Sequence, residues 1–473
     1  MMERYSSQVL GMAMICLASC ATDYSQVIET TENAYYNEDY NTAIPAIRDL
    51  YESSSSKDRL LFLMEAGTIF RTKGDFETSI KVFKEAESIA DNIKQSLSKS
   101  GLSFLLSDNE SNYIGEDFER VMIKYFIALN YLSLGDLENA KIYFRRLDFD
   151  LKEMKFLAPD YRQNNAARLL DAYISENLGR YNDARVQYKN LEQLLSKSPM
   201  LMTDRYVLAA KEGDSKDQSK YMQGSTLVPA YDKSINRINY SPNSKLGELI
   251  IVHEAGKSAI KFSRGKLIDD EYFLVTLRVA IEVALRTEGA GVSATGVLAT
   301  LSTAENPIPI YKERDLYSST IRHFYLNGVD IGSGEVLNNY SDTAIQNYND
   351  NYKAIVTKNV SSIAVKIVAA TIASEAAARA IEERVGKGQN DLVSALIRLG
   401  SGAVAGLATA QTISPDLRCW RTIPANFQIK RIFLEPGNYQ FSMDKTGMRS
   451  SYSPNVQIEA GKPTILTVRS YSN

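Results

Sequence analysis

The sequence predicts an α+β protein, with an all-α N-terminal part of helical repeats followed by a mixed α+β part that ends in a small antiparallel β unit. Three observations support this fold class. Residues 24–197 repeat a pattern of small and aromatic residues at helical spacing. After residue 245 the period of the apolar residues changes, and β-prone runs appear. The 473 residues are enough for more than one domain, at ~150 residues each.

The composition excludes several classes of function. The chain is 44% hydrophobic and 23% charged, as is usual for a soluble globular protein. Its net charge of −3 argues against binding to nucleic acid. Two histidines make a histidine-based metal site or catalytic triad a poor expectation, and three cysteines exclude a disulfide-rich scaffold. We therefore expect no metal, no cofactor and no catalytic residue.

The N-terminus has the pattern of a signal peptide. The apolar run Val9–Leu17 is too short to span a bilayer, which needs ~20 residues, but it fits a signal-peptide core. It leads into Leu17-Ala18-Ser19-Cys20, which resembles the lipobox of bacterial lipoproteins. The resemblance implies that Cys20 becomes the lipidated N-terminus of the mature chain. Two or three acyl chains hold a protein stably at a membrane.

The residues around Cys20 also predict a location. Ala21 follows the cysteine where an aspartate would signal retention at the inner membrane. By resemblance to enterobacterial sorting, this favours the outer membrane, with the protein facing the periplasm. We expect residues 1–19 to be the signal peptide and residues 20–33 to be a polar tether.

The helical repeats are clearest in the stretch that begins at Leu60. Counted from that residue, Gly67 stands at position 8, Gly74 at position 15 and Phe83 at position 24. A small residue at position 8 lets two helices touch, the aromatic side chain fills the space between them, and the glycine permits a left-handed turn. This pattern resembles the tetratricopeptide repeat.

The same template recurs along the chain. It fits again from Val121 and from Asn165, and a weaker copy starts at Tyr24, where Glu38 replaces the glycine. The sequence therefore predicts four helical hairpins, with the repeat domain placed at residues 34–200. Such repeats expose a concave face that docks a peptide or a protein; the alternative is a spacer without a ligand. Three tyrosines could line that groove or belong to the core: Tyr35, Tyr36 and Tyr125.

The second half of the chain mixes both kinds of element. Residues 201–244 are polar and are interpreted as a linker with one short helix, and residues 245–473 as the α+β domain. Two β-prone runs flank Gly256 and predict a hairpin over residues 248–262. The segment Tyr272–Leu285 fits a strand or a helix. Small residues predict a tightly packed helical hairpin at 339–412, lying against a sheet rather than crossing a membrane, and residues 416–473 form the closing β unit.

A segment near the C-terminus carries a further resemblance. Residues 415–425, with Leu434-Glu435-Pro436-Gly437 after them, resemble a largely uncharacterised family of bacterial lipoproteins that join tetratricopeptide-like repeats to an α+β domain. Members carry an Asp-Thr-Arg-x-Trp-x-x-Leu-Pro-Ala stretch; here Leu417 replaces the threonine and Ile423 the leucine. Their genes often neighbour lipoproteins that resemble activators of penicillin-binding proteins. The resemblance implies a part in an envelope complex related to peptidoglycan synthesis.

Within this segment, Asp416, Arg418 and Trp420 alternate, so an extended strand would carry all three on one face. The two charged side chains could pair and the indole could be buried. Two interpretations remain open at this stage. The three residues lock the domains together, or they bind a partner peptide or glycan.

Together these observations predict a lipid-anchored, non-enzymatic adaptor that docks envelope proteins through its repeats. The sequence does not identify the envelope proteins. One alternative is a structural subunit of a secretion or export assembly, in which the chain forms a homo-oligomer. Another is an enzyme acting on envelope glycans, for which no convincing pair of carboxylates stands out.

Overall fold

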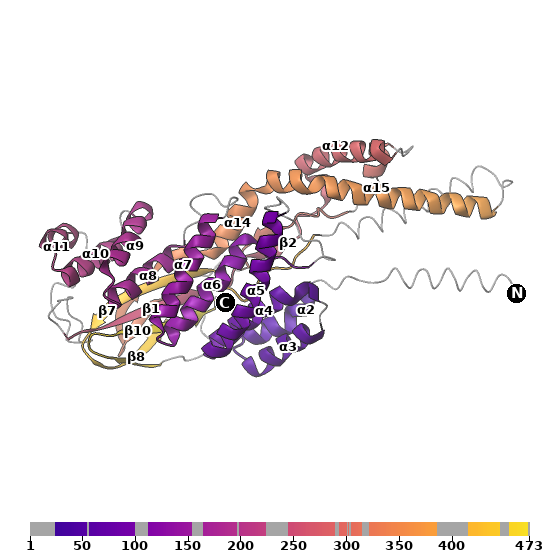
Figure 1. Cartoon of the computed structure of the whole chain (residues 1–473). Helices are drawn as coiled ribbons and strands as arrows, with labels where there is room; N and C mark the ends of the chain where they lie inside the picture. Colours follow the sequence, from indigo (N-terminus) through magenta and orange to yellow (C-terminus); the bar gives the residue numbers. More distant parts are fainter. Residues whose placement is uncertain are drawn as a thin grey trace.

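The computed structural model describes residues 24–53, 56–99, 112–153, 164–195, 198–223, 245–288, 293–299, 301, 304–314, 321–385, 415–444 and 454–471. The predicted signal peptide, Cys20 and the second arm of the helical hairpin at 391–412 lie outside these residues. The N-terminal helices form a long stack against the sheets, and α12 and α15 lie side by side as an arm at one end (Figure 1).

Consecutive helices of the N-terminal part pack in pairs. Their bounds are α2 Tyr24–Tyr36, α3 Tyr40–Ser53, α4 Arg59–Lys73, α5 Phe76–Lys99, α6 Asp117–Ser133, α7 Leu137–Glu153, α8 Asn165–Asn177, α9 Tyr181–Leu194, α10 Pro199–Glu212 and α11 Ser215–Met222, with a short 3-10 turn at Ser56–Asp58.

The turns between paired helices explain the repeat pattern. Gly74, Gly135 and Gly179 each have a positive φ, between 69° and 91°, and each closes one predicted hairpin. Glu38 occupies the same position in the first hairpin and adopts a φ of 60°. This left-handed backbone costs little for glycine and roughly 1–2 kcal/mol for other residues. The four predicted hairpins are confirmed, and the first contains a strained turn.

Two predicted boundaries are wrong. The tether predicted at 20–33 overlaps α2, in which Tyr24 and Ile28 are buried, and the Tyr24 hydroxyl donates to Glu65 of the second hairpin at 3.2 Å. The linker predicted at 201–244 contains α10 and α11, a fifth pair whose turn at Gly213 has a φ of 72°. The template misses this pair because Tyr206 stands where a small residue is expected and Ser215 where an aromatic one is expected.

The strands of the second half join into two larger sheets and a short ribbon within the described residues. The sheet orders are β10-β1-β7-β6, β5-β4-β8-β9 and β2-β3. Their bounds are β1 Gly247–Ala255, β2 Ile260–Phe262, β3 Ile310–Lys312, β4 His323–Leu326, β5 Val329–Ser333, β6 Glu335–Asn339, β7 Asn426–Leu434, β8 Gly437–Met443, β9 Asn455–Ile458 and β10 Pro463–Ser470.

The hairpin predicted at 248–262 does not form. Strand β1 pairs in parallel with β10 and antiparallel with β7, while β2 pairs with β3. All nine residues of β1 are buried. A strand that is buried on both faces is stable in the centre of a sheet, where both of its edges are paired. A hairpin with β2 would satisfy only one edge.

The closing β unit predicted at 416–473 is not a separate unit. Its strands are shared between the sheets: β7 and β10 flank β1, and β8 and β9 complete the sheet of β4 and β5. Residues 415–425 precede β7 and adopt no regular strand. The last segment of the chain is therefore built into strands that come much earlier in the sequence.

The helices of the second half are α12 Glu271–Glu288, α13 Ala294–Ala299, α14 Tyr340–Asp350 and α15 Tyr352–Val385, with a 3-10 turn at Leu267–Asp269. The segment that fitted a strand or a helix is thus helical. The first arm of the predicted helical hairpin is confirmed, with a break at Asn351. Its long part, α15, packs mainly on α12 rather than on a sheet. Within the described ranges, no helix has the length and apolar character needed to cross a membrane.

One apolar core joins both halves of the chain. It runs from the repeats through Ile250 and Val252 of β1 and Trp420 to α12 and α15. A second core, which includes Leu249, Phe324 and Phe441, fills the space between the two larger sheets. The repeats and the α+β part are therefore packed as one body.

Candidate functional site

The groove of the repeats is filled by the chain itself. The first helices of the second to fourth pairs, α4, α6 and α8, are buried along most of their length. Tyr35, Tyr36 and Tyr125 are also buried. They face the C-terminal part: the Tyr125 ring lies 4.9 Å from that of Phe427, and the Tyr36 hydroxyl donates to the Arg421 carbonyl at 2.6 Å. The predicted docking groove is thus occupied internally.

Trp420 lies at the centre of this junction. It is 1% exposed, and its ring centroid lies 5.8 Å from that of Phe83 and 5.4 Å from that of Phe126. Its indole N–H donates to the Thr68 hydroxyl at 3.1 Å. Helices α4, α5 and α6 supply these partners, so one indole connects three helices of the repeats to the C-terminal segment.

Two buried carboxylates on the repeats bind the backbone of this segment. Glu65 accepts hydrogen bonds from the backbone N–H groups of Arg421 and Thr422 at 2.7 and 3.0 Å, and from the Thr422 hydroxyl at 2.6 Å. Glu119 accepts from the backbone N–H of Trp420 at 2.9 Å. Burial raises the pKa of Glu65 to about 7. The repeats hold residues 420–422 as they would hold a bound peptide.

Asp416 and Arg418 form a two-pronged ion pair beside Trp420. Arg418 Nε donates to Asp416 Oδ1 at 2.9 Å, and a terminal guanidinium nitrogen donates to Oδ2 at 2.8 Å. The other terminal nitrogen reaches Asp58, at the start of α4, at 2.6 Å. The expected extended strand is absent here, but the three predicted residues lie together. They are buried between the two parts, which favours the domain-locking interpretation over an accessible partner site.

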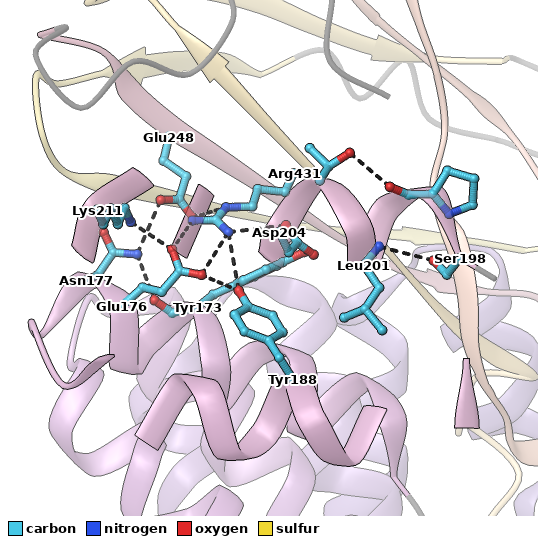
Figure 2. A network of polar contacts seen from close by, with 12 residues as sticks. Tyr173, Glu176, Asn177, Tyr188, Ser198, Leu201, Asp204, Lys211, Glu248 and Arg431 are labelled. Carbon is cyan, nitrogen blue, oxygen red and sulfur yellow. Dashed lines mark hydrogen bonds and ion pairs between the residues drawn. The ribbon is translucent and has the colours of Figure 1, made fainter. Parts of the chain in front are cut away.

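A second polar network joins the repeats to the sheet (Figure 2). Arg431 of β7 is buried and pairs with Glu176 of α8 at 2.7 Å, Asp204 of α10 at 3.2 Å and Glu248 of β1 at 2.9 Å. Lys211 of α10 also reaches Glu176, at 2.9 Å. Two cations and three carboxylates from four elements therefore meet in the interior.

The charges of this network are set by their surroundings. Burial opposes ionisation of Glu176, but Arg431 and Lys211 overcome it and hold the pKa of Glu176 at about 2. Burial raises the pKa of Asp204 to about 7, even though Arg431 favours its ionised form. The Tyr173 hydroxyl donates to Asp204 at 2.8 Å. Such a paired interior network is costly to break.

Sequence reasoning missed most of these partners. It singled out Asp416, Arg418 and Trp420, but not the carboxylates that face them or the network of Arg431. One signal was available. Glu65 follows the apolar run Leu60-Leu61-Phe62-Leu63-Met64, whereas Glu119 stands in the charged first turn of α6, where it closes a capping box, and gives no such signal. An acidic residue in such a buried stretch needs hydrogen-bond donors from elsewhere in the chain.

The outer side of the repeats carries an open groove between α5 and α7, of about 760 Å³. It is lined by Asp91, Lys94, Gln95, Lys124, Arg145, Arg146, Phe149 and Asp150. Four cations face two carboxylates, and the Phe149 side chain is 63% exposed at the edge. Each of the four cations also pairs with a carboxylate of the chain: Lys94 and Lys124 with Asp150, Arg145 with Asp183, and Arg146 with Glu87. The lining itself carries more positive than negative side chains around one apolar side chain.

Two further side chains of reactive types, Cys419 and His253, are buried in the interior. Burial raises the pKa of the Cys419 thiol to about 12, which suppresses the reactive thiolate. Burial lowers the pKa of His253 to about 3, and its ring lies between Gln428 and Ser470. Among the residues that the structure describes, no group of His, Cys, Asp and Glu side chains could hold a metal ion.

One comparison with known proteins matches part of the repeats. The tetratricopeptide repeat family matches residues 123–148, which run from α6 into α7. A crystal structure of a tetratricopeptide repeat protein from Parabacteroides merdae is similar at 15% identity, over 43% of this chain and 80% of that one, with a TM-score of 0.21. No curated protein matches the chain.

Proposed function

We propose that this protein is a non-enzymatic scaffold of the bacterial envelope, anchored by lipid on Cys20, that docks a protein partner on the outer side of its repeats. One observation supports this location of the docking site. The inner groove is filled by residues 415–427 of the chain itself, whereas the groove between α5 and α7 is open and rich in cations. Tetratricopeptide repeats act typically in protein–protein interaction.

The anchor and the location rest on the N-terminal sequence. Leu17-Ala18-Ser19-Cys20 has the spacing of a lipobox, and Ala21 favours the outer membrane. The resemblance of residues 415–437 to bacterial lipoproteins supports an envelope complex related to peptidoglycan synthesis. In this proposal Asp416, Arg418 and Trp420 lock the repeats to the sheets, so that the docking face is held on a rigid body.

The anchor is tested by growing the native host with a labelled fatty acid and separating its membranes. The wild type should carry the label and sediment with the outer membrane, and Cys20→Ala should be unlabelled and released into the soluble fraction. Label that persists in the Cys20→Ala protein would refute lipidation at this residue.

The docking face is tested by crosslinking in the host and identifying captured proteins by mass spectrometry. The double variant Arg145→Glu/Arg146→Glu reverses two charges of the outer groove and should lose an envelope partner that the wild type captures. Arg185→Glu is the matched control, since Arg185 is a half-exposed arginine of α9 that pairs with Glu212 outside the groove. Capture that is unchanged in the double variant would place docking elsewhere.

A structural subunit of a larger assembly is the second candidate. It is favoured by one observation: α12 exposes three valines, Val275, Val279 and Val283, along one side.

A further inference from the structure

Helix α12 exposes an apolar ridge on the side opposite its packed face. Val275, Val279 and Val283 follow one another at a spacing of four residues and are 58–59% exposed. Phe273 and Ile281, on the other side of the helix, are buried, and α12 packs there on α15. Valine is an unfavourable residue on a solvated helix surface, since it loses side-chain freedom and covers nothing. Three such residues in line indicate a face that is covered by another molecule.

The ridge is symmetric about its middle residue. A two-fold axis through Val279 places Val275 of one helix opposite Val283 of an antiparallel copy, and Val279 opposite itself. In such a pair the three valines of each copy remove those of the other from water, and the contact is self-complementary. The spacing therefore fits a second copy of the same helix.

The charges beside the ridge have the same symmetry. Arg278 and Glu282 lie one turn apart, with Arg278 Nε 3.4 Å from Glu282 Oε1 within one chain. In the antiparallel pair, each Arg278 comes close to the Glu282 of the other copy, so the pairs can be exchanged between chains. At the ends, Tyr272 of one copy faces Arg286 of the other, an arrangement that suits a cation–π contact. Both residues are exposed.

We propose that two copies of this chain associate through α12, with the two-fold axis at Val279. The contact is isologous, as is usual for homodimers. One pair of helices buries less than the ~1,200 Å² typical of stable complexes, so the dimer forms at high local concentration. Confinement of the chains to a membrane raises that concentration. The inference does not depend on the outer groove or on a partner protein.

Cysteine crosslinking tests the register, using the full-length protein in detergent with a mild oxidant. Val279→Cys should form a disulfide-linked dimer, because the two thiols meet on the axis. Val275→Cys should not crosslink to itself, since its two copies lie about 12 Å apart at 1.5 Å per residue. A mixture of Val275→Cys and Val283→Cys should crosslink. The matched control is Val186→Cys on α9, which is 59% exposed and lies on the repeats.

Light scattering on Val279→Glu provides the second measurement. The variant should have the mass of one chain at a concentration where the wild type and Val186→Glu show two, with unchanged circular dichroism. The proposal would be overturned if Val279→Cys formed no more crosslinked dimer than Val186→Cys. It would also be overturned if Val279→Glu kept the mass of a dimer. Two other results would assign the valine face to a different ligand. One is a disulfide between Val279→Cys and a different protein. The other is binding of the wild type to anionic phospholipid vesicles that Val279→Glu abolishes while the mass of the protein stays the same. A failure of this kind leaves the scaffold and its outer groove untouched.

Discussion

Replacement of Trp420 by alanine removes the side chain at the centre of the junction between the repeats and the sheets. The indole is 1% exposed and lies against Phe83 and Phe126. Truncation of a buried tryptophan costs ~3–5 kcal/mol through lost burial and the cavity that remains. The indole N–H also donates to the Thr68 and Thr422 hydroxyls, and its loss belongs to this cost; each hydroxyl still donates a hydrogen bond of its own, to the Met64 carbonyl and to Glu65. We expect the free energy of unfolding to fall by about 4 kcal/mol.

Urea denaturation followed by far-ultraviolet circular dichroism measures this loss. Trp420→Phe is the control: the phenyl ring fills part of the space, so the expected loss is only about 1–2 kcal/mol. Trp420 is the single tryptophan of the chain, so fluorescence of the wild type reports on the junction alone. Because one core spans both parts, the fluorescence and dichroism transitions should coincide.

Two results would refute this reasoning. A loss below ~1 kcal/mol in Trp420→Ala would show that the buried indole does not hold the junction together. A wild-type fluorescence transition at clearly lower urea than the dichroism transition would show that the segment detaches while the repeats stay folded.

Three further changes test other parts of the structure. Arg431→Met takes the paired cation from Asp204 and Glu248, while Glu176 keeps Lys211, and should cost ~3–5 kcal/mol by urea denaturation; a loss under ~1 kcal/mol would contradict a buried lock. Glu38→Gly removes the strain of a left-handed turn and should raise the free energy of unfolding by about 1 kcal/mol, whereas Gly74→Ala should lower it by a similar amount. Thermal unfolding measures both changes. A change of the same sign in both variants would be inconsistent with the turn geometry. The folded-state pKa of Glu65 is about 7, above its ordinary value of 4.5, so the unfolded chain binds fewer protons between these values and stability falls as pH rises through this window. Relative to Glu65→Gln, the wild type should lose about 3 kcal/mol between pH 5 and pH 8, and a flat difference would exclude the raised pKa.

The local features of this protein follow from its amino-acid sequence. A glycine at position 15 and small residues at fixed spacing specify a helix, a left-handed turn and a second helix, because these interactions lie within about 30 residues of one another. The first arm of the long helical segment and the fold class follow from periodicity in the same way. Even Glu38 was visible as a departure from the glycine pattern, and its positive φ shows what the departure costs.

Where local signals were weak, the sequence was ambiguous. The β-branched run in Tyr272–Leu285 fitted a strand as well as a helix, since a short apolar run does not fix its own period. Packing on α15 decided for the helix. The fifth pair, α10 and α11, has the turn glycine but departs from the template at Tyr206 and Ser215, and only its place at the end of the stack reveals it.

The occupant of the groove and the neighbours of each strand depend instead on contacts between distant parts of the chain. The pairing of β1 with β10 and the contacts of Glu65 with Arg421 join residues far apart in the chain, and no local spacing encodes such a partner. Burial supplies the reason in both cases: a strand buried on both faces needs two neighbours, and a carboxylate inside a helical stack needs donors. The last segment of the chain meets both requirements, and it thereby turns a groove that the sequence predicted to be open into the junction of a single body.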